Sequence, residues 1–599
     1  MVSPKAHHVF EISWEVCNKV GGIYTVVSSK AAQMITRYGK ENYTLIGPHF
    51  PKKAWGVFEE HITPEAWKET FETLKKEGII CTYGTWLVKG SPMTILIDFS
   101  EFTKHKDTIK KTLWDWYQID SLNTDYYDFD EPILWSFAAG KVIQKLQELT
   151  PNKSIIAHVH EWLCGAALLY LSHEHVNIGT VFTTHATVLG RQLCASGVNV
   201  YTMLQTIKPD EEAKRFGPGM YAKYLVEKVC ATKATIFTTV SEITSIEAQY
   251  LLGRKPDVIL LNGLDMEKFP TFEEASLKHR HYKARIREFC LAYFFPYTPF
   301  DLDQTLFYFL AGRYEFRDKG VDIYIKALAK LNDQLKREES TRTIVAFIFI
   351  PGNVRGIKPD ILENKTYFDG LKETIEENIE YIRTRILYGI VENKNLDREF
   401  LFDDDVREEL RRNALLLHRT GTPPLSTHDL LDENTDAITN TLRAYGLDNK
   451  PDDRVKIIFY PIYLSGADNL LNTTYYESMH GCHLGIFPSL YEPWGYTPLE
   501  ASALGVPSIT TDLAGFGRYV QKQGIAQNTP GIFVLHRFNT DDEEVINQLT
   551  EMMHYYGTTT KQDRVENKIR AREIAEKADW KYFIDNYIEA HNKAVQRFS

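Results

Sequence analysis

Residues 489–500, SLYEPWGYTPLE, place two glutamates eight positions apart, around a glycine and the start of a predicted helix. Thr497, Pro498 and Glu500 fit a capping box with proline at the first helical position. Such a helix would begin just behind Gly495, where free backbone N–H groups and the helix dipole can hold a phosphate. An acid, a glycine and an anion-binding helix end suit transfer of a sugar from a nucleotide diphosphate. An ordinary capped helix after a turn explains the capping box equally well.

Apolar runs that are typical of buried parallel strands recur in both halves of the chain. They span residues 9–12, 154–157, 179–184 and 234–239 in the first half, and 306–310, 343–350, 455–459, 484–487 and 508–511 in the second. Strands that alternate with helices predict α/β layers. Two such sets predict two doubly wound, Rossmann-like domains that face each other across a cleft, where the ligands of such sheets bind.

We expect a first domain at residues 1–270 and a second at 271–565, with C-terminal helices at 566–599 that pack back on the first domain. Between residues 356 and 447 the pattern changes to a helical insertion. Its apolar stripe consists of Leu371, Ile375, Ile379, Ile382 and Ile386. This stripe fits either ordinary packing or a subunit interface.

Composition limits the classes of function. The chain has 599 residues, of which 43% are hydrophobic and 25% charged, as in a folded protein of more than one domain. Its net charge of −11 leaves no basic surplus for phosphates, so we expect no nucleic-acid partner. Seven scattered cysteines without a CxxC pair favour a reducing compartment. Neither a signal core nor a run of about 18 apolar residues is present, so we expect a cytoplasmic protein without a membrane partner.

Cations and glycines follow several of the predicted strands. Arg313 and Lys319 surround a strand-to-helix turn, from which both could reach a diphosphate, although ordinary surface cations look the same. In the first half, Lys19 precedes Gly21 and Gly22. Two glycines would let the backbone approach a nucleotide or sugar, and a simple turn is the alternative.

Histidines occupy two strand ends in the first half. His185 directly follows the strand at 179–184, with Arg191 six residues later. His158 and His160 form an HxH pair, but no third ligand is spaced to complete a metal site, so we expect no metal.

Two acidic groups could be taken for the metal-binding carboxylates of a different transferase fold. They are Asp128 with Asp130, and residues 403–405. Their surroundings favour solvated acids of loops and helix starts.

Longer motifs resemble the eukaryotic-type glycogen synthases. In chain order they are residues 10–16 (FEISWEV), 19–24 (KVGGIY), 158–162 (HVHEW), 182–191 (FTTHATVLGR), 261–264 (LNGL), 311–316 (AGRYEF), 481–485 (GCHLG) and 489–500. The resemblance implies a GT-B fold and a retaining, metal-independent transfer of glucose from UDP-glucose to the non-reducing 4-OH of glycogen, which forms α-1,4 links. The first domain would face the acceptor and the second the nucleotide sugar.

The resemblance also implies a role for each matching residue. Glu492 would be the carboxylate near the reacting anomeric carbon, Glu500 would bind the ribose, and Tyr475 would stack on the uracil. The catalytic set would be completed by Arg313, Lys319, His185 and Arg191. Further contacts to the nucleotide sugar would come from Lys19, Gly21, Gly22, Asn262, Trp494, Gly495, Tyr496 and Thr497. His160 and Glu161 would lie on the acceptor side.

In this family an arginine cluster before an Asp-Trp pair reads glucose-6-phosphate. Counting back from Asp579 and Trp580, this chain offers Lys561, Arg564, Lys568 and Arg570, and has Glu573 where the pattern has arginine. Arg564 and Lys568 lie one helical turn apart and could share a phosphate with His279 and His483. A solvated amphipathic helix is the alternative.

The family's tetramer-forming region matches the helical insertion, so the resemblance favours a homotetramer and leaves a glycogenin-like primer open as a partner. Three functions remain open: a UDP-glucose-dependent glycogen synthase, an ADP-glucose-using glucosyltransferase on the same fold, and a glycogen-binding scaffold without catalysis. Retention by one carboxylate leaves two routes, a short-lived ion pair with front-face attack or a covalent intermediate.

Overall fold

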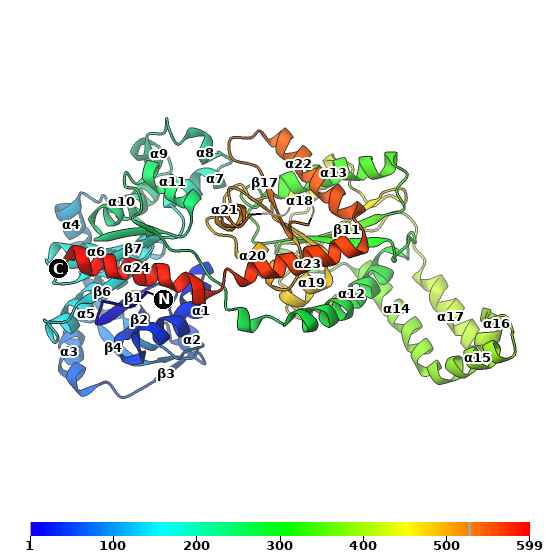
Figure 1. Cartoon of the computed structure of the whole chain (residues 1–599), viewed down its shortest axis with the longest axis horizontal. Coiled ribbons are helices and arrows are strands. Elements are labelled where there is room, and N and C mark those ends of the chain that lie inside the picture. Colours follow the sequence, from blue (N-terminus) through cyan, green and yellow to red (C-terminus); the bar gives the residue numbers. More distant parts are fainter. Residues whose placement is uncertain (1, 525–528, 599) are drawn as a thin grey trace.

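The computed structural model describes residues 2–524 and 529–598. The chain forms two α/β lobes side by side, and a helical arm projects from the far end of the second lobe (Figure 1). The first lobe is built on a nine-stranded sheet and the second on a six-stranded one. The predicted fold class, two doubly wound domains with a helical insertion in the second, is confirmed.

In the first lobe the strands follow the order β3-β4-β5-β2-β1-β6-β7-β8-β9. β4 runs antiparallel to β3 and β5, and the other neighbours are parallel. The strands are β1 (His8–Ile12), β2 (Tyr43–Pro48), β3 (Phe58–Glu60), β4 (Ile80–Trp86), β5 (Met93–Asp98), β6 (Ile155–His160), β7 (Gly179–Thr184), β8 (Ile236–Thr239) and β9 (Val258–Ile259). The helices are α1 (Gly22–Tyr38), α2 (Pro51–Ala54), α3 (Glu65–Lys76), α4 (Lys106–Tyr117), α5 (Glu131–Glu148), α6 (Gly165–His173), α7 (Val188–Ala195), α8 (Val200–Met203), α9 (Pro209–Arg215), α10 (Pro218–Lys233), α11 (Glu242–Leu251) and the C-terminal α24 (Trp580–Phe598).

Successive residues of the central strands bury opposite faces of this sheet, because side chains alternate along a strand. Phe10 and Ala157 join the apolar cluster under α5 and α6. Val9 and Ile156 join the cluster under α1 and α24. Burial on both faces explains why these strands read as continuous apolar runs.

In the second lobe all six strands are parallel, in the order β14-β11-β10-β15-β16-β17. They are β10 (Thr305–Ala311), β11 (Thr343–Phe349), β14 (Val455–Phe459), β15 (Leu484–Ile486), β16 (Ser508–Thr511) and β17 (Ile532–Leu535). The helices are α12 (Phe272–Phe294), α13 (Val321–Arg337), α18 (Ala437–Ala444), α19 (Tyr475–Gly481), α20 (Tyr496–Ala503), α21 (Gly515–Lys522), α22 (Asp542–Thr558) and α23 (Lys561–Glu576).

The helical arm is shorter than the predicted insertion at 356–447. It consists of α14 (Pro359–Glu377), α15 (Ile379–Val391), α16 (Arg398–Leu401) and α17 (Asp404–Leu417), which project away from both lobes (Figure 1). An antiparallel pair, β12 (Val354–Ile357) and β13 (His428–Leu430), closes its base. The chain after β13 returns to the lobe, where α18 packs on α13.

Two paired segments carry the chain between the lobes. Leu264 N donates to Ala578 O at 2.9 Å, and Trp580 N donates to Leu264 O at 3.2 Å. The return to the first lobe therefore comes at residues 578–580 rather than at the predicted 566, because α23 packs on α20 and β17 of the second lobe. α24 then contacts α1, β6 and β7 of the first lobe (Figure 1). Within the described ranges, no helix combines the length and the apolar character needed to cross a membrane.

Candidate active site

Two loops at one edge of the second sheet are fastened to each other. They follow β10 and β15, which are neighbouring parallel strands. Leu490 N and Tyr491 N donate to Asp318 O at 2.8 and 3.2 Å. Gly320 adopts a φ of +67°, and a Cβ there would lie 2.0 Å from Pro488 O. Only glycine fits this approach, so the backbone fixes the relative position of both loops.

Glu492 and Lys319 are the two charged side chains that meet at this edge. Lys319 Nζ lies 2.5 Å from Glu492 Oε2, and the side chains are 17% and 23% exposed. Arg313, on the same loop as Lys319, is 65% exposed and pairs with Glu315 at 2.9 Å. The structure therefore brings Lys319, but not Arg313, onto the predicted catalytic carboxylate.

The helix behind Glu492 begins differently from the predicted capping box. α20 starts at Tyr496, and its N-cap is Gly495 with a φ of +108°. Because glycine supplies no capping oxygen and no other side chain in the described part of the molecule takes its place, the first N–H groups stay available to an anion. Thr497 lines a small cavity together with Lys319 and Glu492.

Glu500 does not cap this helix but turns toward α19. Its carboxylate accepts hydrogen bonds from Tyr476 OH at 2.8 Å and Tyr475 OH at 3.3 Å. Burial raises the pKa of Glu500 to about 7, and the two tyrosines partly offset that effect. The predicted ribose-binding acid and the predicted uracil-stacking tyrosine thus lie in direct contact.

Three other residues predicted to contact the nucleotide sugar have different surroundings. The ring of Trp494 is 3% exposed and packs among Phe516, Tyr519 and Phe583. Its side chain therefore belongs to the apolar core, and the predicted ligand contact of this residue stays a prediction. Tyr496 OH donates to the backbone carbonyl of Gly263 at 3.3 Å, across the lobes.

Asn262 is buried in the segment that leaves the first lobe. Its Oδ1 has no hydrogen-bond partner among the described residues. Because a buried amide oxygen is costly to leave unpaired, this atom is free to accept a bond from a ligand.

On the first lobe, buried carboxylates pin the loop that carries His185. Glu161 Oε1 accepts from the backbone N–H of His185 at 2.7 Å and of Ala186 at 3.2 Å. Burial raises the pKa of Glu161 to about 7 against the opposing effect of Arg191. Glu227 accepts from Val188 N at 2.9 Å. These bonds use backbone donors that would otherwise be unpaired at a strand end.

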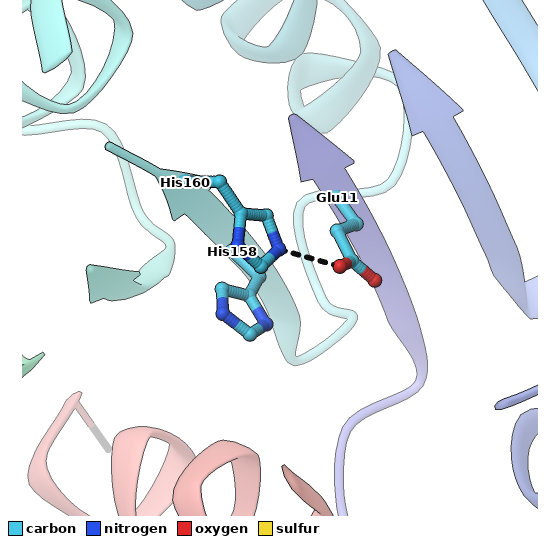
Figure 2. A group of neighbouring side chains, drawn as sticks. All are labelled: Glu11, His158 and His160. Carbon is cyan, nitrogen blue, oxygen red and sulfur yellow. Dashed lines mark hydrogen bonds and ion pairs between the residues drawn. The ribbon is translucent and has the colours of Figure 1, made fainter. Parts of the chain in front are cut away.

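His160 and His185 belong to a buried hydrogen-bonded chain. His160 Nδ1 lies 2.9 Å from His185 Nε2. His160 Nε2 lies 2.6 Å from Glu11 Oε1 (Figure 2). Lys30 and Tyr43 also donate to the Glu11 carboxylate. Burial alone would raise the pKa of Glu11, but Lys30 and His160 hold it well below its ordinary value. Burial lowers the pKa of both histidines, so their rings are neutral.

Glu11, His158 and His160 come close enough together to resemble a metal site. Their ligand atoms all lie within 4.8 Å of one another (Figure 2). The atoms already have protein partners, however. His158 Nε2 is hydrogen-bonded to Thr183 at 2.7 Å, and His158 Nδ1 to His591 at 3.1 Å. Lys30 forms an ion pair with the Glu11 carboxylate. These contacts explain the group as a core hydrogen-bond network.

The acceptor-side role of His160 and Glu161 stays a prediction, and both residues are buried. The two residues are 1% and 8% exposed, and their polar atoms hold Glu11 and the His185 loop. Their side chains therefore position the site from beneath.

Arg191 comes from the first lobe and faces the second. It lies on α7. Burial of the guanidinium alone would lower the pKa of Arg191, but Tyr491, Glu161, Glu315 and Glu492 raise it. Two of these acids, Glu315 and Glu492, belong to the loops after β10 and β15. Arg191 thus brings first-lobe positive charge into the field of the predicted catalytic carboxylate.

Lys19, Gly21 and Gly22 form the exposed entry to α1. Glu15 Oε2 accepts from Gly21 N at 2.7 Å and from Tyr24 N at 2.9 Å. A Cβ on Gly21 would lie 3.1 Å from Glu15 Oε1, whereas Gly22 has open space around it. An internal acid therefore occupies backbone N–H groups beside the glycine pair, where the prediction expected the backbone to approach a nucleotide or sugar.

A second cluster of positive charge lies between α12 and α23. Burial, together with the charges of Lys283 and Arg564, lowers the pKa of Lys568 to about 7. His279 and His483 stand 5.4 Å apart, centroid to centroid, and Lys568 also lowers the pKa of both. Within residues 2–524 and 529–598, no acid forms an ion pair with Lys283, Arg564 or Lys568. Such a cluster is a site for an anion.

Arg570 does not belong to this cluster. Its guanidinium pairs with Glu573 at 3.0 Å on the same helix. Glu573, which replaces an arginine of the family pattern, thus removes one predicted cation from the site. Lys283 on α12 supplies a cation that the helical spacing along α23 could not identify.

Comparison with known proteins supports the family that the sequence motifs resemble. A family model described as glycogen synthase matches residues 11–599. The chain belongs to the glycogen synthase family. It is 36% identical over 590 residues to the liver glycogen [starch] synthase of Mus musculus, covering 98% of this chain and 83% of that protein. It is 38% identical over 616 residues to glycogen [starch] synthase isoform 2 of Saccharomyces cerevisiae, covering 99% and 86%.

A solved structure matches the whole of this glycogen synthase family member. It is the catalytic domain of Starch Synthase IV from Arabidopsis thaliana bound to ADP and acarbose, with a TM-score of 0.52 and 14% identity, covering 99% of this chain and 100% of that one. At this identity the match concerns the fold alone. It agrees with the GT-B fold that the sequence motifs implied.

Several residues that build the site of this family member were not predicted from the sequence. Glu227 and Glu247 lie inside α10 and α11, and Lys30 inside α1. Each is a charged residue at an apolar position of its helix, and that departure from the periodicity is the one sign that could have identified it.

Proposed function

We propose that this protein transfers glucose from UDP-glucose to the non-reducing 4-OH of glycogen in the cytoplasm, retaining the α configuration and forming α-1,4 links. The observation that carries the proposal is the Lys319–Glu492 pair, 2.5 Å apart, beside the uncapped N-terminus of α20. Its relatives named glycogen [starch] synthase support the same reaction.

The donor's diphosphate needs positive charge as the glycosidic bond breaks, because charge develops on the departing oxygen. Lys319 and the first N–H groups of α20 supply it from the second lobe. Arg313 would exchange its exposed partner Glu315 for the diphosphate. Arg191 would add charge from the first lobe. These groups do the work that a metal ion does in other transferases, so the proposal requires no metal.

Recognition of uridine would rest on the contact between α19 and α20. Tyr475 would stack on the base, and Glu500 would accept hydrogen bonds from the ribose hydroxyls. A carboxylate in the low-dielectric site that raises the pKa of Glu500 to about 7 forms strong bonds to such donors. An ADP-glucose-using enzyme is the alternative that the residues allow.

His185 would bind a sugar hydroxyl, and its tautomer follows from the buried chain. Glu11 is ionised and accepts from His160 Nε2–H. The Nδ1 atom of the neutral His160 must then accept from His185 Nε2–H. This assignment leaves Nδ1 of His185 as the acceptor atom for the substrate.

Retention of configuration follows two routes that use the same residues. In front-face attack, Glu492 stabilises a short-lived oxocarbenium ion, and the leaving phosphate takes the proton of the acceptor hydroxyl. In double displacement, Glu492 attacks the anomeric carbon, and the acceptor then attacks the glucosyl-enzyme. The Lys319–Glu492 pair serves both routes and does not choose between them.

Two further proposals concern regulation and assembly. We propose that glucose-6-phosphate binds the cluster of Lys283, Arg564 and Lys568, because these cations lack acidic partners among the described residues. We also propose a homotetramer formed through the helical arm, whose α15 exposes large apolar side chains. They include Leu387 at 60%, Ile390 at 65% and Val391 at 84% exposure. A glycogenin-like primer would supply the first acceptor chain.

The direct test is incorporation of labelled glucose into glycogen from UDP-glucose and, in parallel, from ADP-glucose, without added metal. Preference for UDP-glucose supports the proposal, and preference for ADP-glucose replaces it with the alternative. A folded protein that binds glycogen and transfers from neither donor would be a scaffold. Digestion of the product by an enzyme specific for α-1,4 links reports the configuration.

A further inference from the structure

Tyr491 belongs to the second lobe by sequence and to the first lobe by packing. Its ring is 4% exposed and lies in the apolar cluster of the first lobe, together with Leu490 and Leu513. It stacks at 6.5 Å and 21° with Tyr201. Its hydroxyl donates to Glu247 Oε1 at 2.8 Å and lies 3.4 Å from Thr187 O. The side chain before Glu492 is therefore inserted into the opposite lobe.

Glu247 receives this hydroxyl at a junction of the first lobe. Its Oε1 also accepts from Thr187 Oγ1, and its Oε2 accepts from Tyr201 OH at 3.2 Å. Thr187 is the N-cap of α7 and accepts from Gly190 N at 3.0 Å. A Cβ on Gly190 would lie 2.1 Å from Glu247 Oε1, so this glycine leaves room for the carboxylate. The junction thus fixes the segment between His185 and Arg191, the two first-lobe residues of the proposed site.

The other side of Glu492 reaches the same helix of the first lobe. Gly515 N donates to Glu492 O at 3.2 Å, and Gly515 begins α21. A Cβ on Gly515 would lie 2.5 Å from Ser241 Cβ, and Ser241 is the N-cap of α11, the helix that carries Glu247. α11 and α21 lie beside each other between the lobes (Figure 1). Tyr491, next to Glu492 in sequence, and Gly515, bonded to the Glu492 carbonyl, thus both contact α11 or its N-cap. These contacts hold Glu492 against one element of the opposite lobe.

These contacts exist only while the lobes are together, since the covalent links between the lobes are the paired segments near Leu264 and Ala578. With the lobes apart, Tyr491 would lose both its apolar surroundings and the partner of its hydroxyl. Glu247 is 1% exposed, and burial raises its pKa to about 7, so an added donor from Tyr491 is favourable there.

We propose that Tyr491 is a positioning residue that couples closure of the two lobes to the placement of Glu492, through its hydrogen bond to Glu247. Closure then sets His185, Arg191 and Glu492 in one step, because the Glu247 junction holds the first two and Tyr491 orients the third. The inference rests on the proposed function, which gives Glu492 its part in the reaction. Such gating is a general way to keep water from a reactive donor until the acceptor is bound.

The test compares Tyr491→Phe with Tyr201→Phe. Both substitutions remove one hydroxyl from Glu247, but only the first removes a bond between lobes. We expect Tyr491→Phe to lower kcat roughly tenfold or more, because hydrogen bonds to ionisable groups are strong. The KM for UDP-glucose should change by less than about threefold, because Tyr491 positions Glu492 and does not contact the donor. Tyr201→Phe should stay within about threefold of wild type. Glu247→Gln keeps an acceptor oxygen and should retain more activity than Glu247→Ala.

Small-angle X-ray scattering supplies a readout that does not depend on turnover. UDP should reduce the radius of gyration of the wild type and of Tyr201→Phe, and should reduce that of Tyr491→Phe less. Equal kcat and equal compaction in the two phenylalanine variants would overturn the inference. Absence of glucose transfer by the wild type would overturn the proposed function instead, while compaction would still decide the role of Tyr491. Unchanged circular dichroism and Tm exclude misfolding as the cause.

Discussion

The ammonium group of Lys319 lies 2.5 Å from the carboxylate of Glu492, although 173 positions separate them in the chain. The two residues follow β10 and β15, which are neighbours in a parallel sheet. The carboxyl ends of such strands meet at one edge, where ligands of these folds bind. The backbone bonds from Leu490 and Tyr491 to Asp318 keep the pair in register. The proposed chemistry depends on this relationship.

Lys319 and Glu492 should act as a unit, so that removing either charge lowers activity. We expect Lys319→Ala to lower kcat/KM for UDP-glucose by about 10²-fold or more, since the diphosphate loses a cation in the transition state. The kcat/KM of the double variant Lys319→Ala with Glu492→Ala should be little lower than that of the less active single variant, because the effects of residues that act as a unit are not additive. Lys330→Ala is the control, because Lys330 lies on α13 and pairs with Glu543 at the surface. Additive losses in the double variant would argue against a shared role.

The buried pair of Lys30 and Glu11 should dominate the stability of the first lobe. Lys30→Met leaves the Glu11 carboxylate buried without its cation, and we expect the free energy of unfolding to fall by about 3–5 kcal/mol. The double variant Lys30→Met with Glu11→Leu should recover part of this loss, because no charge is then buried. Lys68→Met, which breaks an exposed pair with Glu65, should change stability by less than about 1 kcal/mol. Urea denaturation measures all three, and equal effects at Lys30 and Lys68 would contradict the assignment.

Binding of glucose-6-phosphate should depend on pH through Lys568. Its pKa is lowered from 10.5 to about 7, so the unbound side chain loses its proton as the pH rises through 7. Affinity should therefore fall between pH 7 and 9, and it should also fall below about pH 6, where a phosphate monoester loses its second charge. Lys568→Met should abolish the decline above pH 7 and weaken binding throughout.

Arg564→Ala should also weaken glucose-6-phosphate binding, whereas Arg570→Ala should leave it nearly unchanged, because Arg570 pairs with Glu573 outside the cluster. Isothermal titration calorimetry measures each affinity. A loss at Arg570 as large as that at Arg564 would place the phosphate elsewhere on α23.

The helical arm should control the oligomeric state. Glutamate at positions 390 and 391, introduced as Ile390→Glu and Val391→Glu, would put charge on the most exposed apolar positions of α15. We expect a shift from tetramer toward smaller species in light scattering coupled to gel filtration. Thr384→Glu, on the same helix, is the matched control because its position is exposed and polar. A tetramer that survives both apolar substitutions would require another interface.

Much of the fold follows from local patterns, and much of the site does not. The runs at 9–12, 179–184 and 508–511 became buried strands because parallel sheets cover both faces, so that periodicity and burial agree. The family resemblance predicted Glu492 and Lys319 as site residues, and the structure places them in contact. Glu247, by contrast, lies inside an amphipathic helix, and its role appears only when the second lobe brings Tyr491 to it. A contact between lobes leaves no periodic trace in either segment.

The errors have physical causes as well. A capping box at Thr497 requires the helix to start there, but the positive φ of Gly495 starts it at Tyr496 and frees Glu500 for two tyrosines. The family resemblance implied a ligand contact for Trp494, whose ring is buried in the core. Its neighbours in space, Phe516 and Phe583, come from distant parts of the chain.

The most direct measurement is turnover of Glu492→Ala with UDP-glucose and glycogen, alongside its affinity for UDP. The account predicts that kcat falls by about 10²–10³-fold or more, because the carboxylate acts on the reacting carbon, while UDP still binds within a few-fold of wild type. Turnover within about threefold of wild type, in a variant that binds UDP normally, would contradict the assignment of Glu492 and with it the proposed active site.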